Sequence, residues 1–87
     1  EVRPLGALLL KGKTEPIDTF TPVTPAQIRS GLAEQYRAAY RAAQQDAGVA
    51  LAAFEAVADR FPNDPLTRFH VERLRNGLRD VVIRLDQ

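Results

Sequence analysis

Two short proline-containing segments divide this 87-residue chain and limit how it can fold. In "TPVTP", Thr24 is placed to cap a helix, Pro25 to occupy its first turn, and Gln27 to complete a capping box. In "FPNDP", Asp64 and Pro65 repeat the cap and the first-turn proline. Proline has no backbone N–H and is tolerated at a helix start but not in its interior. The sequence therefore predicts a short N-terminal piece followed by helices.

Behind these starts, the apolar residues follow the helical period. The first predicted helix spans about residues 25–44, and Gly31 inside it is expected to weaken it by up to about 1 kcal/mol relative to alanine. After a break at "QQDAG", Asp46 caps a second helix over about residues 47–60, and a third covers about 65–78. We expect three antiparallel helices whose buried stripes are Ile28, Leu32, Tyr36 and Tyr40; Ala50, Ala53, Phe54, Val57 and Phe61; and Leu66, Phe69, His70, Leu74 and Leu78.

The N-terminal piece carries strand signals. Leu5–Leu10 is a short apolar run, "KGKTEP" supplies turn residues, and Ile17–Phe20 alternates apolar with polar side chains. This pattern predicts a β-hairpin, which by itself is marginal in water. The β-branched segment Asp80–Asp86 predicts a short last strand, and we expect it to be a pairing partner for the hairpin.

Composition argues against several classes of protein. Twelve Lys and Arg against eleven Asp and Glu give a net charge of +1, so no nucleic-acid partner is indicated. The chain has no cysteine, which excludes disulfides and thiolate metal sites. The run Ala7–Leu10 is far shorter than the roughly 20 residues that cross a bilayer, so we expect no direct membrane contact from this segment. The expected location is the cytoplasm, and an upstream region of the longer protein could still anchor it in a membrane. The chain begins with Glu1 rather than methionine, which suggests a piece of a longer protein.

The stretch "VRPLGALLLKGKTEPIDTF" (Val2–Phe20) resembles the closing β-hairpin of class III nucleotide cyclases. That family ends its catalytic domain with a glycine-containing strand, then "LKGK", then a proline-containing strand that ends in an aromatic residue. The resemblance implies that Lys11 contacts the nucleotide triphosphate. For the isolated chain, the favoured interpretation of Lys11 and Lys13 is that they are solvated turn residues. The family's metal-binding aspartates, base-recognising residues and transition-state Asn and Arg have no counterparts here, so we predict no catalytic residues and no ATP cyclisation.

The stretch Tyr36–Leu74 is similar to the helical tail that follows the catalytic domain in bacterial cyclases. Those tails are similar to tetratricopeptide units, and Ala50, Phe54 and Pro62 match the signature of the second helix of such a unit. The first helix matches poorly, and the chain holds about one and a half units.

The resemblance implies two domains and a fold class. Residues 1–22 would be a β-hairpin remnant of the catalytic domain, and residues 23–87 a tetratricopeptide-like helical domain. The predicted fold is mainly α, a three-helix bundle with an N-terminal hairpin and a short C-terminal strand.

Several polar residues are candidates for function. A metal site at His70 is disfavoured because no cysteine or second histidine is present, so we favour a core histidine. We favour burial of Tyr36 and Tyr40 against the second helix over a peptide groove. Surface and capping roles are favoured for the acidic residues Glu55, Asp59 and Asp64. A basic set near the C-terminus is favoured as a solvated face or as a docking face for an acidic partner domain, rather than as a phosphate site. The candidate interaction face is Arg68, Arg73, Arg75 and Arg79.

The leading hypothesis is a non-catalytic accessory or regulatory region of an adenylate or guanylate cyclase. Its implied partners are the upstream catalytic domain and a second copy in a homodimer. The parent reaction would convert ATP or GTP into a cyclic nucleotide and pyrophosphate with Mg²⁺ or Mn²⁺, while this region needs no cofactor of its own. The alternatives are a stand-alone helical adaptor that binds a peptide and, third, a basic phosphate-binding module.

Overall fold

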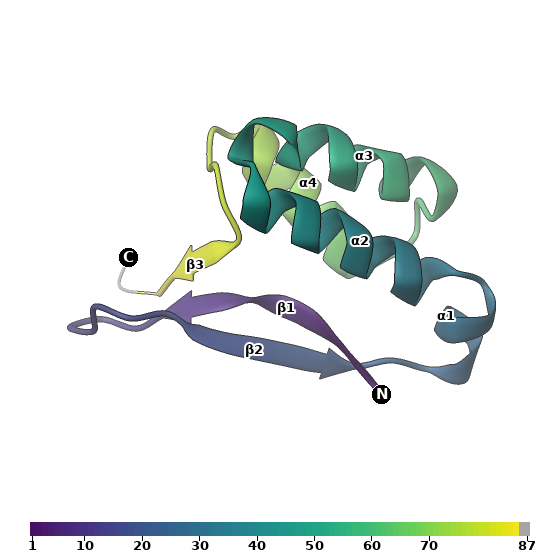
Figure 1. The fold of residues 1–87 in the computed structure, drawn as a ribbon, viewed down its shortest axis with the longest axis horizontal. Coiled ribbons are helices and arrows are strands. Elements are labelled where there is room, and N and C mark those ends of the chain that lie inside the picture. The colour runs from purple at the N-terminus through teal and green to yellow at the C-terminus, as the bar shows by residue number, and fades with distance from the viewer. Residues whose placement is uncertain (86–87) are drawn as a thin grey trace.

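The computed structural model describes residues 1–85 and places a small sheet beside a stack of helices (Figure 1). The helices α2, α3 and α4 lie side by side on one side of the sheet, and α1 lies at the far end, where the hairpin leads into α2. The elements in chain order are β1 (Val2–Leu9), β2 (Ile17–Pro22), α1 (Pro25–Arg29), α2 (Leu32–Gln45), the 3₁₀ turn η1 (Ala47–Val49), α3 (Ala50–Arg60), α4 (Pro65–Arg75) and β3 (Val82–Arg84).

The sheet has the strand order β2-β1-β3. β1 pairs antiparallel with β2, with Leu8 opposite Ile17, and parallel with β3, with Leu8 opposite Ile83. The register with β2 shifts between Pro4 and Gly6, which leaves Leu5 as a bulge. The predicted hairpin and last strand are both confirmed, although Asp86 of the predicted last strand lies outside the described residues.

The first predicted helix is wrong in its continuity. It is interrupted after Arg29, because Gly31 adopts a left-handed conformation (φ 87°) that a helix interior excludes and that glycine adopts without strain. The capping box of Thr24 and Gln27 is confirmed, but it starts only the five-residue α1. No residue of α1 is buried, so Ile28, predicted to be in the core, is 44% exposed.

The second and third helices are shorter than predicted. Asp46 is an N-cap as expected, and its carboxylate accepts from the N–H of Gly48 at 2.8 Å. The turn that follows is 3₁₀, however, so α3 begins only at Ala50. At the other end of the stack, α4 stops at Arg75 rather than at residue 78. Gly77 takes a φ of 93°, and the N–H of the next residue bonds back to a carbonyl in the last turn, which ends the helix.

The buried side of α4 also differs from the prediction. Phe69 is 41% exposed and Leu78 is 46% exposed, although both were assigned to the apolar stripe. The buried residues of α4 are instead Thr67, His70, Val71 and Leu74. These positions face both α3 and the sheet. The buried side of α4 therefore includes polar side chains such as Thr67, which a search for apolar residues alone does not assign to the core.

The core lies between the helices and reaches the sheet through β1 and the segment before β3. Tyr36 and Phe54 are fully buried and meet edge to face with ring centroids 5.7 Å apart. Small residues such as Ala39 and Ala50 allow the helices to approach closely. The predicted burial of Tyr36 and Tyr40 is confirmed. Of the helices within residues 1–85, none combines the length and apolar character needed to cross a membrane.

Candidate functional site: a polar clamp on β1

Side chains from α2 and α4 hold the edge of β1 that faces the helices. Arg37 donates to the carbonyl of Val2 (Nη2–O 2.6 Å), and Tyr36 donates to the carbonyl of Pro4 (Oη–O 2.6 Å). His70 donates to the carbonyl of the bulge residue Leu5 (Nε2–O 2.7 Å). β3 pairs only with residues 7–9, so these three side chains occupy the place of a strand along the first half of β1.

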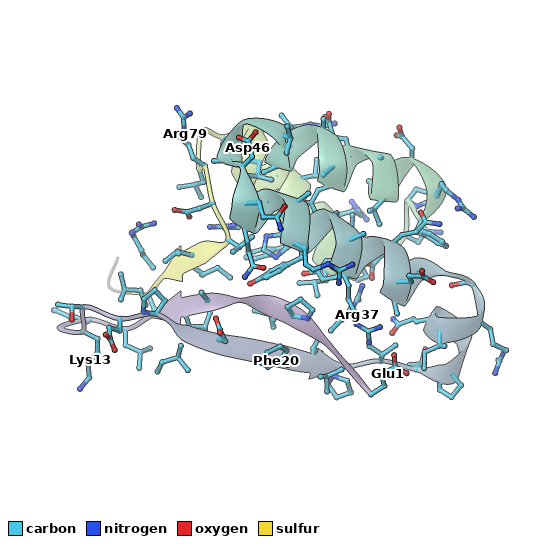
Figure 2. All side chains as sticks on the ribbon, in the orientation of Figure 1. Glu1, Lys13, Phe20, Arg37, Asp46 and Arg79 are labelled. Carbon is cyan, nitrogen blue, oxygen red and sulfur yellow. The ribbon has the colours of Figure 1, made fainter. Side chains whose placement is uncertain are left out.

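The sequence of β1 suits this arrangement. Pro4 has no N–H, so its helix-facing side presents only an acceptor, which Tyr36 satisfies. The bulge at Leu5 lets two consecutive carbonyls turn toward the helices, where a regular strand would alternate them. In Figure 2, Arg37 extends from α2 toward Glu1, and the two side chains form an ion pair of 2.9 Å.

A buried ion pair ties β1 to the start of α4. Both terminal nitrogens of Arg3 bond to the carboxylate of Asp64, at 2.8 and 2.7 Å, and the two side chains are only 5% and 2% exposed. The N–H and hydroxyl of Thr67 donate to the same carboxylate. The guanidinium of Arg3 also lies over the ring of Tyr36, 4.8 Å from its centroid. Asp64 thus combines the predicted helix cap with a charge pair.

The surroundings of Asp64 favour its charged form. Burial by itself raises the pKa of this carboxyl, but the hydrogen bonds from Arg3 and Thr67 outweigh it, so the pKa is lowered below 3.8. Sequence reasoning missed Arg3 entirely. The signal that could have found it is an arginine just before the apolar run Leu5–Leu10. An arginine this close to a core is buried only when it has a charged partner, so a search for that partner was warranted.

His70 lies at the centre of the packing and is fully buried. Its ring stacks on Phe54 at 4.9 Å, and its Nδ1 is 3.3 Å from a terminal nitrogen of Arg73, from which it accepts. Burial lowers the pKa of His70 to about 4, an effect that nearby Arg73 reinforces and the bond to Leu5 partly offsets. The imidazole is therefore neutral at pH 7, and the predicted core histidine is confirmed.

Arg73 closes the outer edge of β3. It donates to the carbonyls of Asp80 (Nη1–O 3.1 Å) and Val82 (Nη2–O 2.8 Å), while the Asp80 carboxylate accepts from the N–H of Val82 at 3.1 Å. We call the set of side chains that hold the helix-facing edges of β1 and β3 the strand clamp. Its members are Arg3, Tyr36, Arg37, Asp64, His70, Arg73 and Asp80.

The four arginines of the predicted interaction face separate in the structure. Arg68 and Arg75 line the same surface hollow between α3 and α4, and Arg75 pairs with Glu55 at 2.8 Å. Arg73 turns inward to the clamp. Arg79 lies in the loop after α4, against a different hollow near η1, as its position beside Asp46 in Figure 2 shows.

The predicted nucleotide contact Lys11 is exposed in the hairpin turn. The neighbouring Gly12 has a φ of 81°, and the N–H of Lys13 closes the turn on the carbonyl of Leu10 at 3.0 Å. Figure 2 shows Lys13 at the tip of the hairpin, pointing away from the helices. The turn and the arginines of α4 are thus separate surfaces.

A shallow groove of about 190 Å³ lies between β2 and α2. Its lining combines apolar surface from Pro4 and Phe20 with the guanidinium groups of Arg37 and Arg41. Tyr40 contributes its ring; burial, with Asp18 nearby, raises the pKa of its hydroxyl. Such a surface suits an apolar side chain that carries an acidic neighbour.

The chemistry of the clamp is that of holding a strand, since its polar groups bond to one another and to the backbone of β1 and β3. Within residues 1–85, the Nε of Arg3 is the exception, because it is buried without a hydrogen-bond partner. Residues 1–85 contain no cluster of three or more histidine, cysteine or acidic side chains arranged to hold a metal ion. Comparison of the chain with family models, curated proteins and solved structures found no match.

Proposed function

We propose that this chain is the C-terminal accessory region of a class III adenylate or guanylate cyclase, and that it couples a nucleotide-binding hairpin to a helical regulatory module. The strand clamp carries the proposal. The helices grip β1 through the buried pair of Arg3 and Asp64 and through three carbonyls, so a displacement of α2 or α4 moves the hairpin that bears Lys11.

The sequence resemblance of Val2–Phe20 to the family's closing hairpin supports this assignment, as does the antiparallel hairpin with Lys11 in its turn. In the parent enzyme, Lys11 would meet the triphosphate of ATP or GTP as a compact cation, and upstream residues would hold Mg²⁺ or Mn²⁺. The region itself adds no catalytic group, and its partners are the upstream catalytic domain and a second copy. Its place is the cytoplasm.

The helical part is proposed to be tetratricopeptide-like. The antiparallel pair α2 and α3 buries Ala50 and Phe54, and Pro62 follows α3, as in the second helix of such a unit. α4 would begin a second unit, but the chain then returns to the sheet through β3 instead of adding another helix. The proposed tetratricopeptide-like region therefore covers about one and a half units.

The first test uses the reading frame that precedes Glu1. We expect it to encode a catalytic domain with two metal-binding aspartates. The longer protein should make a cyclic nucleotide from ATP or GTP with Mg²⁺ or Mn²⁺, and the 87-residue chain should not. A preceding frame without such a domain, or cyclisation by the 87-residue chain, would show that the proposal is wrong.

A second test addresses Lys11 in that longer protein. Lys11→Ala should raise the KM for the nucleotide by roughly tenfold, the effect of losing about 1.4 kcal/mol of charge-assisted bonding. Lys13→Ala, in the same exposed turn, is the matched control. Equal effects of the two substitutions would mean that the turn acts only through general charge.

The adaptor alternative is favoured by one observation, the groove between β2 and α2. Phe20 and Arg41 on its two walls would receive an apolar and an acidic residue of a peptide. A search of a peptide library with the 87-residue chain separates the two functions. Binding that shifts the amide signals of Phe20 and Arg41, together with a preceding frame that lacks a cyclase domain, would favour the adaptor.

A further inference from the structure

The two outer edges of the sheet are finished differently. The helix-facing edge is closed by side chains as far as Val82, by Arg37, Tyr36 and His70 on β1 and then by Arg73 and Asp80 at the start of β3. No strand can add there without displacing these bonds. The opposite edge is β2, which pairs with β1 on the side away from β3 and lies below β1 along most of its length in Figure 1.

The backbone direction along β2 follows from the ladder. The N–H of Ala7 donates to the carbonyl of Val81, on the side of β3. The backbone N–H and C=O groups of its neighbour Leu8 therefore point the other way, toward the partner Ile17 on β2. Because this direction alternates along β2, the N–H and C=O groups of Asp18 and Phe20 point away from β1, in the plane of the sheet. Within the part of the chain that the structure describes, these four groups have no hydrogen-bond partner.

Prolines bound this open segment on both sides. Pro22 is the next outward-facing residue after Phe20, and Pro16 directly precedes β2, so neither missing N–H disturbs the hairpin. The edge therefore offers two donors, at Asp18 and Phe20, and the matching acceptors, in a window of defined length. An unpaired edge of this kind is a template for another strand.

We propose that two copies of this chain associate through their β2 edges, antiparallel, with Thr19 on the two-fold axis. In this register Asp18 lies opposite Phe20 of the second copy, and each such pair exchanges two backbone hydrogen bonds. Pro16 then lies opposite Pro22 of the second copy, so the positions without donors coincide. The edge is self-complementary, as a two-fold interface requires.

The neighbouring registers are excluded by the same residues. A shift by two residues in one direction places the carboxylate of Asp18 opposite that of the second copy, which is repulsive. A shift in the other direction places Asp18 opposite Pro22, which cannot donate to the carbonyl of Asp18. Only the register centred on Thr19 satisfies all four outward groups.

Side chains near the edge fit the same partner. Ile17 and Phe20 are 54% and 55% exposed beside the edge, and a second copy would cover part of both. Asp18 of the second copy, placed opposite Phe20, approaches the groove, whose lining carries two guanidinium groups, of Arg37 and Arg41, against one carboxylate, that of the first copy's own Asp18. The charge of the incoming strand is thus complementary to the surface it meets. The proposed function already includes a second copy as a partner, and this inference names the surface through which two copies meet. A chain that stays monomeric would remove this interface, whereas the tests of the preceding reading frame and of Lys11 would be unaffected.

Cysteine cross-linking tests the register directly, because the natural chain has no cysteine. A directly opposed pair without backbone bonds brings the two Cβ atoms to within disulfide distance. Thr19→Cys should therefore form a disulfide-linked dimer on mild oxidation. Asp18→Cys and Thr21→Cys, which do not face themselves, should cross-link much more slowly. Equal cross-linking of all three variants, or faster cross-linking through Asp18→Cys, would overturn the proposed register.

Sedimentation equilibrium of the 87-residue chain tests the association itself. We expect a reversible monomer–dimer equilibrium that Phe20→Lys weakens by roughly tenfold or more, through loss of apolar contact and repulsion from the basic groove. Val49→Lys is the matched control, since Val49 is 44% exposed in η1, at the end of α2 and away from β2. A chain that stays monomeric at millimolar concentration, or equal weakening by the two variants, would refute the proposal.

Discussion

The two strands of the hairpin differ in how their free edges are satisfied. The helix-facing edge of β1 is held by charged and aromatic side chains from α2 and α4, including a buried ion pair. The outer edge of β2 is open and is flanked by prolines. The difference indicates that the hairpin is firmly attached to the helices along one side and available for pairing along the other. The following predictions test this contrast, from the largest expected effect to the smallest.

Breaking the buried ion pair should have the largest effect. Asp64→Ala leaves the guanidinium of Arg3 buried without its partner and removes the cap of α4, so we expect a loss of about 3–5 kcal/mol in the free energy of unfolding. Urea unfolding followed by circular dichroism measures it. Asp59→Ala, on the exposed side of α3, is the control and should change stability by less than about 0.5 kcal/mol.

A double variant sharpens this result. Arg3→Met combined with Asp64→Ser removes both charges and keeps a side chain able to cap α4. We expect it to be more stable than Asp64→Ala, since the main penalty is the unpaired buried cation. A double variant that is less stable than Asp64→Ala would mean that the attraction between the two charges contributes more to stability than the burial of an unpaired Arg3 costs.

Acidification should weaken the clamp through His70. Its pKa is about 4 in the folded chain and 6.5 in the reference state, so the unfolded chain binds more protons between these pH values. The stabilisation is fully present above pH 6.5 and is lost as the pH falls toward 4. The expected loss is about 3 kcal/mol. Asp64, whose pKa is lowered below 3.8, adds a further loss in more acidic solution.

Urea unfolding across this pH range measures the effect. His70→Gln keeps a donor for the carbonyl of Leu5 and does not titrate, so its stability should change much less between pH 6.5 and 4. An equal pH dependence in the two proteins would assign the acid sensitivity to other groups.

The two core tyrosines provide a matched pair. Tyr36→Phe leaves the carbonyl of Pro4 without its donor, for an expected loss of about 1–3 kcal/mol. Tyr40→Phe removes a hydroxyl that has no hydrogen-bond partner within residues 1–85 and lies at the groove, so the loss should stay below about 0.5 kcal/mol. Thermal unfolding of both variants decides whether the hydroxyl of Tyr36 holds β1, since similar losses would contradict that role.

The smallest effect is expected at the hairpin turn. Lys11→Ala alters an exposed side chain that takes no part in the clamp, so the stability should change by less than about 0.5 kcal/mol. A larger loss, measured by urea unfolding, would mean that the turn contributes to the attachment of the hairpin. The same variant therefore serves as a folded probe in the nucleotide test above.

The helix starts could be predicted because they depend on local chemistry. Thr24, Asp46 and Asp64 each cap a helical segment within three residues of their own position. The break at Gly31 and the early end of α4 before Gly77 were missed, since glycine inside an apolar period is compatible with both a helix and a turn. The exposure of Phe69 was missed for another reason, because the buried side of α4 depends on where the sheet lies.

The candidate site was mostly beyond prediction. Its contacts to β1 join residues more than 30 positions apart in the chain, such as Arg3 with Asp64 and Leu5 with His70. His70 was correctly assigned to the core, but its bond to a strand was not foreseen. Arg73 was assigned to a surface and instead binds the backbone of β3. The assignment of residues 1–22 and 23–87 to two domains stays a prediction about origin.

The sequence by itself determined the local elements of this protein: a hairpin with its turn, the capped helix starts and a β-branched last strand. These depend on backbone preferences and on hydrogen bonds between near neighbours. Only the tertiary structure decided which polar side chains are buried and which strand edge they close. A buried charge or imidazole is stable only beside a partner, and that partner is set by the packing of distant segments.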